Sequence, residues 1–256
     1  MSKPLVSYVI PCYNCQTTIF DTVMSIKDTD LLVRHEKELL WPKIEVILVN
    51  DGSTDYTLSI IKSLEDEFEN VKVIDLGENK GKGIARNTGN KAAKADIIGV
   101  LDSDDLHIGD RTGEILKYFK ENPDMDVFYS SYKTIHTYNG KEGLFKAKRI
   151  NPVQLWECGT FAIGHSTVAY TKKAILEQPY SEDKNKDDWQ MLWNFYTNKY
   201  KFRYSTKPLI AYKITQEDIE KMYTPGLEEH LLEKKQKIMK PYFDKLEVEA
   251  NVTNES

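Results

Sequence analysis

Apolar blocks of strand length alternate with amphipathic blocks of helix length in the first part of the chain. The apolar blocks cover residues 5–11, 44–49, 71–76 and 96–101, and the nearly continuous run at 44–49 is typical of a strand buried on both faces. The blocks with helical spacing cover residues 17–26, 53–64 and 83–94, and Ser53 or Thr54 is a candidate cap for the second. Strands that alternate with helices predict an α/β fold with a mainly parallel central sheet flanked by helices.

The pattern loosens after about residue 109. The elements expected there are a helix at 111–120, a strand at 126–138 with a hairpin at Asn139-Gly140, a helix at 187–198 and one or two strands at 201–214 around Pro208. Charged helical sequence follows from residue 217, with breaks at Pro225-Gly226 and Pro241. No linker is visible, so we expect one domain over 1–214, with halves of about 1–108 and 109–214, and a helical C-terminal extension with a polar tail over 215–256. The link at 28–43 is unusually long, and its sequence indicates no role.

Composition narrows the class of protein. The 256 residues are 40% hydrophobic and 29% charged, which is typical of a soluble globular chain and excludes disordered or fibrous classes. No apolar run reaches the roughly 18–20 residues of a membrane span, and the N-terminus has no signal-peptide core. Three cysteines fit a reducing compartment, so we expect a cytoplasmic protein. A net charge of −5 argues against a dedicated nucleic-acid binder.

Polar residues follow each of the four predicted strands. They are Pro11-Cys12-Tyr13-Asn14, the segment from Asn50 to Asp55, the glycine-rich segment from Gly77 to Gly83, and the segment from Asp102 to Asp105. In parallel α/β sheets, ligands bind beyond the carboxyl ends of the strands. We therefore expect these segments to converge on one cleft.

Asp102 and Asp104 are candidate ligands of a divalent cation. Residues two apart in extended backbone project to the same side, and Mg²⁺ or Mn²⁺ prefers carboxylate and phosphate oxygens. The alternative is an acidic surface turn, since a lone Asp-x-Asp is common. The position directly after a buried strand favours the metal site.

Basic residues concentrate between Lys80 and Lys94 in an otherwise acidic chain. The glycines and the predicted helix start there suit a diphosphate, and the alternative is a solvated helix face. The glycines do not form the dinucleotide fingerprint, because Arg86 stands at the position of the third glycine, and the chain has no P-loop motif.

Four further groups have a structural and a functional interpretation. Cys12 and Cys15 form a C-x-x-C, but without a second such pair or paired histidines we favour two unpaired thiols over a zinc or redox site. His165 lies in a candidate acceptor loop, although a structural histidine is the favoured interpretation. Asp187 and Asp188 open a helix, where acids suit the helix dipole, and the alternative is a general base. Trp189 and Trp193 are expected in the core, with a sugar-stacking wall as the alternative.

Taken together, several strings resemble those of family-two glycosyltransferases with the GT-A fold. The resemblance runs from about residue 7 to residue 214. The strings are VIPCYN, VILVNDGSTD, ENKGKGIARNTGNKAAKADIIGVLDSDD, GHSTVAYTKKAI and DDWQMLWNFYTNKYKFRYSTKPLIAYKI, in the order of the family. The resemblance implies an inverting transferase that uses a nucleotide-sugar donor, most often a UDP-sugar, with Mn²⁺ or Mg²⁺. It makes 1–108 the nucleotide-binding half and 109–214 the acceptor half.

The same resemblance implies roles for individual residues. The donor-binding set comprises Pro11, Tyr13 and Asn14 beside the nucleoside, Asp51 on the base, Arg86 on the nucleotide, and Asp102 with Ser103. Asp102 and Asp104 form the metal-binding Asp-x-Asp, with Asp104 the expected direct ligand. Asp188 falls on the catalytic base, and Asp187 beside it replaces the usual Glu. Two further departures are Asn50 for the usual Asp and Thr215 where several relatives place a His.

Two other functions compete with sugar transfer. Nucleotidyl transfer usually needs a Gly-rich loop with Arg or Lys after the first strand, and the loop here is PCYNC. A sugar-nucleotide-binding protein without transfer activity is the non-enzymatic alternative, and the later acidic pair argues against it.

The acceptor stays open: a glycan, lipid-linked, protein or nucleic-acid hydroxyl each fits. Lys146, Lys148 and Arg149 offer a basic cluster, although isolated basic runs are usually solvated. In the C-terminal extension, an apolar stripe favours packing on the domain or a homodimer over a membrane surface; it comprises Leu227, Leu231, Ile238 and Tyr242.

Overall fold

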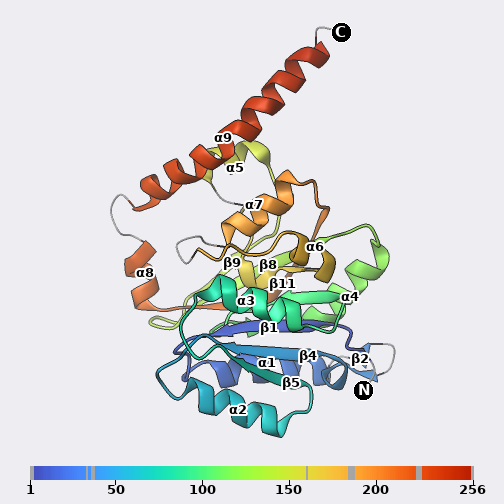
Figure 1. Ribbon diagram of the computed structural model, residues 1–256, viewed down its shortest axis with the longest axis vertical. Helices are drawn as coiled ribbons and strands as arrows, with labels where there is room; N and C mark the ends of the chain where they lie inside the picture. Colours follow the sequence, from blue (N-terminus) through green and yellow to red (C-terminus); the bar gives the residue numbers. More distant parts are fainter. Residues whose placement is uncertain are drawn as a thin grey trace.

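A computed structural model describes residues 3–32, 34–35, 38–159, 161–183, 188–222 and 227–254. Its centre is a nine-stranded sheet in the order β5-β4-β1-β6-β10-β8-β11-β7, with β9 added beside β8. Helices cover both faces of this sheet, and the C-terminal helix α9 (Leu227–Asn254) projects beyond the body (Figure 1). The predicted α/β class with a central sheet and flanking helices is confirmed.

The first half of the sheet is parallel. It comprises β1 (Ser7–Cys12), β4 (Glu45–Asn50), β5 (Val71–Asp75) and β6 (Ile97–Val100). β1 lies between β4 and β6, and all three run in the same direction. Every residue of β4 is buried, as its continuous apolar sequence predicts for a strand covered on both faces. The four predicted strands are thus confirmed, within one or two residues at each end.

The second half of the sheet is mixed. It comprises β7 (Leu106–His107), β8 (Val127–His136), β9 (Glu142–Phe145), β10 (Ala169–Thr171) and β11 (Phe202–Ile214). β10 pairs antiparallel with both β6 and β8, whereas β11 pairs parallel with β8. The expectation of a mainly parallel sheet therefore holds for the first half only. Pro208 does not end β11 but shifts its register, because a proline lacks the N–H that a regular ladder needs.

Two apolar cores lie on opposite faces of the sheet. One face packs against α1 (Ile19–Leu32), α2 (Thr57–Glu67) and α4 (Arg111–Glu121). The other face packs against α3 (Lys82–Ala92), α6 (Lys172–Glu177) and α7 (Trp189–Thr197). Because β1 is covered on both faces, its end is held rigidly between the two layers, and this end carries the first loop of the site.

Short elements complete the chain. They are β2 (Arg34–His35), β3 (Glu38–Leu39), α5 (Pro152–Cys158), α8 (Gln216–Met222) and the 3₁₀ turns at Trp41–Lys43 and His165–Thr167. The long link at 28–43 thus contains the end of α1, a two-stranded ribbon and the first of these turns.

Two predictions at helix ends are wrong. Tyr56, not Ser53 or Thr54, precedes α2, and it gives no side-chain cap. Pro241 lies inside α9 rather than ending it. The expected break at Pro225-Gly226 lies outside the described residues. In α9, Met239 is buried and Tyr242 packs on Trp193, with ring centroids 5.4 Å apart, so part of the expected stripe does pack on the domain.

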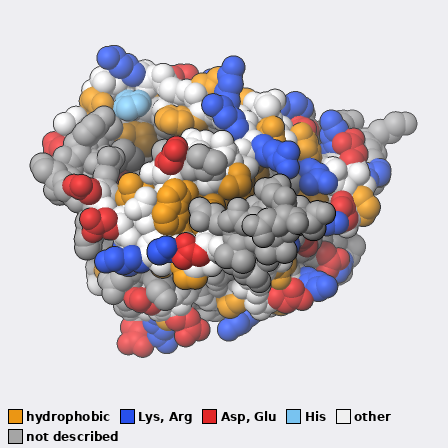
Figure 2. Space-filling view, turned by 90° about the horizontal axis from the view of Figure 1, so that it is seen from above, with side chains coloured by type: hydrophobic (Ala, Val, Ile, Leu, Met, Phe, Trp, Pro, Cys, Tyr) orange, Lys and Arg blue, Asp and Glu red, His pale blue; other side chains and the backbone are white. Residues whose placement is uncertain are grey.

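The surface on the side of α9 carries acidic, basic and hydrophobic side chains interspersed (Figure 2). This face is therefore not a continuous basic surface of the kind that tracks a nucleic-acid backbone. Among the described residues, none of the helices combines the length and the apolar character that crossing a membrane requires.

Candidate active site

The loops after β4 and β5 approach each other closely at the carboxyl edge of the sheet. Gly52 has a φ of +67°, and a Cβ atom there would lie 2.3 Å from the carbonyl carbon of Glu78. Only glycine fits both the left-handed backbone and this backbone-to-backbone contact. The glycine in the Asn-Asp-Gly-Ser string therefore allows the two loops to meet.

Asp51 holds the second of these loops through its carboxylate. Its two oxygens accept the backbone N–H groups of Lys80 and Gly81, at 2.6 and 2.9 Å. The side chain is nearly fully buried, yet it lines a pocket beside β1. Each carboxylate oxygen has a second lone pair, so Asp51 retains acceptor capacity toward a ligand.

The loop after β1 presents an aromatic ring and an anchored asparagine. Tyr13 is 49% exposed and lines the same pocket with Pro11. Asn14 has a φ of +48°; its backbone N–H donates to Ser53 Oγ at 3.1 Å, and its Oδ1 accepts from the N–H of Thr54 at 2.8 Å. Asn14 thus ties the first loop to the second rather than lining the pocket.

Asp102, Ser103 and Asp104 follow β6 and line this pocket together. The hydroxyl of Thr22 on α1 donates to the Ser103 carbonyl oxygen at 2.9 Å, which fixes the turn. Desolvation and the neighbouring Asp102 carboxylate raise the pKa of Asp104. The second of these causes, two carboxylates close together, is the arrangement that a cation relieves.

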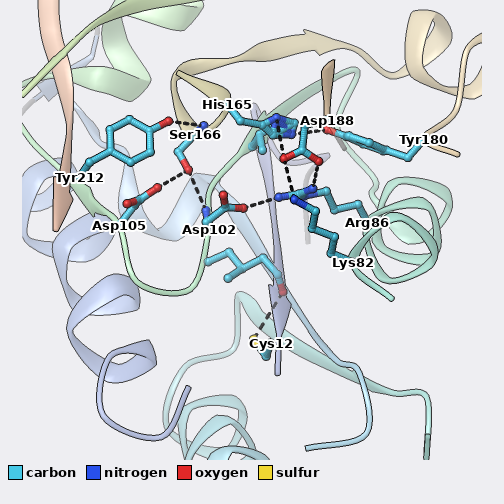
Figure 3. A network of polar contacts seen from close by, with 12 residues as sticks. Cys12, Lys82, Arg86, Asp102, Asp105, His165, Ser166, Tyr180, Asp188 and Tyr212 are labelled. Atoms are coloured by element: carbon cyan, nitrogen blue, oxygen red, sulfur yellow. Dashed lines mark hydrogen bonds and ion pairs between the residues drawn. The ribbon is translucent and has the colours of Figure 1, made fainter. Parts of the chain in front are cut away.

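Arg86 on α3 joins two carboxylates from distant parts of the sequence. One guanidinium nitrogen donates to Asp102 Oδ1 at 2.5 Å, and another donates to Asp188 at the start of α7. Figure 3 shows the guanidinium lying between these two side chains. Arg86 is only 2% exposed, so the pairs are shielded from solvent. Desolvation opposes ionisation of Asp102, but the charge and hydrogen bond of Arg86 together with the charge of His165 outweigh it, and the pKa of Asp102 is lowered.

Asp188 faces three nitrogen-bearing side chains. Besides Arg86, the Nζ of Lys82 lies 3.2 Å from Asp188 Oδ2, and the Nδ1 of His165 lies 3.9 Å from the same oxygen. Desolvation works against ionisation of Asp188, but the charges of His165 in its protonated form, Arg86 and Lys82 together outweigh it and hold the pKa of Asp188 well below the usual range. Desolvation lowers the pKa of His165, which favours its neutral form. Asp187, the other predicted acid, lies outside the described residues.

Tyr180 fixes the orientation of His165. Its hydroxyl lies 3.0 Å from His165 Nε2, and its ring lies 5.3 Å from the Arg86 guanidinium. His165 therefore lies between Tyr180 and Asp188, a placement that suits a structural histidine as well as a residue of the site.

A second cluster of polar side chains fixes the backbone of Asp102. Ser166 Oγ accepts the Asp102 N–H at 3.0 Å and donates to Asp105 Oδ2 at 2.5 Å. The backbone N–H of Ser166 donates to the hydroxyl of Tyr212 on β11, at 2.8 Å (Figure 3). The turn after β6 is thus held by residues from the second half of the chain.

Two connected hollows surround these groups. The first, of about 210 Å³, is lined by Pro11, Cys12, Tyr13, Asp51, Lys82, Arg86, Asp102, Ser103 and Asp104. The second, of about 340 Å³, is lined by Asp102, Asp104, Asp105, Tyr212, Lys213, Ile214 and Asp218. Asp102 and Asp104 line both, so they mark the junction. Thr215, the position at which the sequence resemblance implies a His in several relatives, instead caps α8: its Oγ1 accepts the N–H of Asp218 at 3.2 Å and donates to the Asp218 carboxylate at 2.6 Å.

Two side-chain groups near the site do not carry its chemistry. Cys12 and Cys15 are free and buried, as the sequence predicts. Trp189 and Trp193 stack on each other at 5.4 Å and are buried, so the core interpretation of both holds.

Sequence reasoning found part of this site and missed the rest. Of the predicted residues, the structure brings together Pro11, Tyr13, Asp51, Arg86, Asp102, Ser103, Asp104 and Asp188. It adds six that were not assigned to the site: Lys82, Asp105, His165, Ser166, Tyr180 and Tyr212. Lys82 lies in the basic segment that the sequence singled out, but no sequence signal distinguishes the two tyrosines from core tyrosines.

The junction fits a divalent cation that a phosphate helps to bind. Asp102 keeps one oxygen beyond its bond to Arg86, and Asp104 is exposed to the same hollow. The described residues contain no group of three acidic, histidine or cysteine side chains that would form a complete cage. Mg²⁺ is usually held by one or two carboxylates plus substrate phosphates, so two aspartates are sufficient.

Known sequences that resemble this chain include glycosyltransferases and a polysaccharide synthase. The family model described as glycosyl transferase family 2 matches residues 7–178. An uncharacterized glycosyltransferase of Haemophilus influenzae is 32% identical over 122 residues, which are 48% of this chain and 45% of that protein. A poly-beta-1,6-N-acetyl-D-glucosamine synthase of Staphylococcus aureus is 26% identical over 209 residues, 78% of this chain and 47% of that protein. The chain thus spans about half the length of these relatives.

Solved structures share the fold. TarS residues 1–349 of S. aureus in complex with UDP superimposes with a TM-score of 0.63 and 21% identity, over 90% of this chain and 65% of that one. The mannosyltransferase PcManGT of Pyrobaculum calidifontis, in complex with GDP-Man and Mn²⁺, gives a TM-score of 0.59 and 18% identity, over 84% of this chain and 57% of that one.

Proposed function

Because the chain belongs to glycosyl transferase family 2 and is a glycosyltransferase, we propose that it moves a sugar from a UDP-sugar to an acceptor hydroxyl with inversion at the anomeric carbon. The observation that carries this proposal is the link from Asp102 through Arg86 to Asp188. It sets a candidate cation ligand and a candidate base on the two sides of one guanidinium, close enough to act on one donor and one acceptor in a single in-line displacement.

The donor is proposed to lie in the hollow beside β1. Tyr13 and Pro11 offer apolar surface to the nucleoside, and Asp51 accepts a base N–H through a free lone pair. Lys82 and Arg86 extend from the first turns of α3 and face the diphosphate, where the helix dipole also favours negative charge. The UDP in the TarS complex and the GDP-Man in the PcManGT complex support a nucleotide-sugar donor, and the first favours UDP.

Asp188 is proposed as the general base. Attack by a hydroxyl at neutral pH needs a carboxylate that takes its proton, which typically contributes about 10²–10⁴-fold in rate. Asp188 is ionised because Lys82 and Arg86 face it. When the donor diphosphate shares these two cations, they offset less of the charge on Asp188, and its proton affinity rises. Donor binding would thereby prepare the base before the acceptor arrives.

Asp102 and Asp104 are proposed to hold the divalent cation, with Asp104 as the direct ligand. When bound, such a cation neutralises the charge that grows on the departing diphosphate. Arg86 holds Asp102 in position for this role, and Ser166 fixes the backbone from which it projects.

Calorimetric titration of UDP, UDP-sugars and GDP-sugars, with and without Mn²⁺, tests this proposal. We expect UDP-sugars to bind more tightly than GDP-sugars, and Mn²⁺ to strengthen binding to the wild type more than to Asp104→Ala. Asp124→Ala is the matched control. It removes an exposed carboxylate that pairs with Lys201 and lines neither hollow. If neither class of nucleotide sugar bound in the presence of Mn²⁺, the proposal would be wrong.

A further inference from the structure

A larger cleft lies apart from the candidate active site, on the acceptor half. Its volume is about 640 Å³, and it is walled by β8, β11, the last turn of α7 and the middle of α9. Its lining comprises Tyr129, Arg149, Ile150, Pro152, Tyr196, Lys199, Tyr200, Phe202, Arg203, Tyr204 and Tyr242. It shares no residue with the hollows at Asp102, so the proposed donor and metal chemistry leaves it unused.

Aromatic rings dominate the walls of this cleft. Tyr129 and Tyr204 stack at a centroid distance of 5.5 Å, and Tyr196 and Tyr242 lie 5.9 Å apart across α7 and α9. Tyr196, Tyr204 and Tyr242 are each partly exposed, so part of each ring is available to a ligand. Rings fixed by their neighbours offer flat apolar surface at a low cost in conformational entropy.

The charged residues of the cleft are all cationic. Arg149, Lys199 and Arg203 line it, and no Asp or Glu among the described residues does. Lys199 donates to the Tyr242 hydroxyl at 2.9 Å, whereas Arg149 is exposed and makes no hydrogen bond or ion pair to any described residue. In a chain with a net charge of −5, a cleft lined by cations alone is not explained by composition, and it favours an anionic ligand.

We propose that this cleft binds an acidic glycan, whose sugar rings lie on the tyrosines and whose phosphate or carboxylate groups pair with Arg149, Lys199 and Arg203. The tyrosine rings can stack on the apolar faces of sugar rings, and the separate cations can pair with acidic groups spaced along the same polymer. A single-stranded nucleic acid has similar chemistry, but it usually needs an extended basic groove, and the surface on the side of α9 mixes both signs of charge (Figure 2).

The cleft is placed to hold a distant part of the acceptor, an interpretation that rests on the proposed function. Asp188 precedes the first residue of α7, and Tyr196 lies in its last turn. Eight residues of α-helix span about 12 Å along the axis. A short oligosaccharide bridges such a distance, so a glycan bound in the cleft can extend toward the proposed base.

Binding is tested with defined probes in the absence of any donor. Oligogalacturonate supplies ring carboxylates and phosphorylated dextran supplies phosphates, while neutral dextran and inorganic triphosphate separate the sugar ring from the charge. We expect at least one acidic glycan to bind, with an affinity that falls as the ionic strength rises from about 0.05 to about 0.5 M. Neutral dextran and triphosphate should bind much more weakly.

Single substitutions at exposed positions locate the binding site. Arg149→Gln and Arg203→Gln should each weaken acidic-glycan binding by about fivefold, the scale of one partly exposed ion pair. Lys117→Gln removes an exposed charge from α4 and is the matched control, expected to leave binding unchanged. UDP affinity, measured on the same samples, should be unaltered in all three variants, which verifies that they are folded.

The outcomes separate this proposal from the proposed function. Equal affinity for triphosphate and for acidic glycans would overturn it, as would tighter binding of oligo-dT or loss of glycan binding in Lys117→Gln. Failure of both acidic glycans to bind a protein that binds UDP would overturn it while leaving the proposed function intact. If the protein bound acidic glycans but not UDP-sugars, the proposed ligand of the cleft would be supported and the proposed donor would be contradicted.

Discussion

As the proposed general base, Asp188 must meet two opposing requirements. A general base has to be ionised at working pH, and the cations facing Asp188 ensure that it is. A carboxylate whose pKa is strongly lowered is, however, a weak base. The two requirements are compatible if the donor diphosphate engages Lys82 and Arg86, as proposed, because these two cations also help to ionise Asp188.

Lys82→Met tests this coupling through the pH dependence of turnover. Loss of a positive charge raises the pKa of Asp188, so protonation of the base should begin at a higher pH. We expect the acidic limb of the profile of kcat/KM against pH to move upward in pH relative to the wild type. The side chain of Lys82 is 54% exposed, so the change should leave the fold intact.

Lys80→Met is the matched control for this experiment, because Lys80 lies two residues away and pairs with Glu78 at 3.5 Å instead. Its acidic limb should coincide with that of the wild type. An unchanged limb in Lys82→Met, or a downward shift, would show that Asp188 is not the group that titrates.

At the element scale, the site depends on loops that meet at the carboxyl edge of the sheet. The sequence predicted the strands because apolar runs of strand length alternate with helical blocks, and the continuous run of β4 is buried throughout. It failed at the start of α2 because the polar groups of Ser53 and Thr54 are used elsewhere: Ser53 Oγ accepts the N–H of Asn14, and the N–H of Thr54 donates to the Asn14 side chain. Local capping patterns do not reveal such competition from a distant loop.

Two glycines with similar backbone conformations allow the cost of backbone strain to be distinguished from the cost of a steric clash. Gly52 and Gly140 have φ values of +67° and +68°, but only Gly52 has backbone atoms within reach of an added Cβ. Gly140→Ala should lower the free energy of unfolding by about 1 kcal/mol through backbone strain alone, and Gly52→Ala by about 3 kcal/mol or more. Urea unfolding measures both.

Gly52→Ala should also weaken UDP binding, because it displaces the loop whose N–H groups hold Asp51. Gly140→Ala should leave UDP binding unchanged. Equal losses of stability in the two variants would mean that the loops do not meet as described.

At the scale of the whole molecule, the candidate site is formed by both halves of the chain. Pro11, Asp51 and Asp102 follow strands of the first half, and sequence position relative to those strands was enough to predict them. His165 and Tyr180 come from the second half, whose mixed sheet has no comparably regular pattern. Their position depends on β10 running antiparallel beside β6, which no local periodicity specifies.

Ligand binding should stabilise the assembled molecule. Saturation at about 100 times Kd adds about 2.7 kcal/mol, which corresponds to a rise in Tm of about 5–10 °C for a chain of this size. We expect UDP with Mn²⁺ to produce this rise in the wild type and in Asp124→Ala. In Asp104→Ala, or in the wild type with EDTA, the increment from Mn²⁺ should disappear. An Mn²⁺ increment that persists in Asp104→Ala would place the cation elsewhere.

The most direct test of the account compares turnover and donor affinity in Asp188→Asn. The asparagine keeps the shape of the side chain but cannot take a proton, so the sugar-transfer rate should fall by about 10²–10⁴-fold. UDP should bind at least as tightly as to the wild type, because Lys82 and Arg86 lose a competing carboxylate. A transfer rate within a few-fold of the wild type would contradict the assignment of Asp188 as the base.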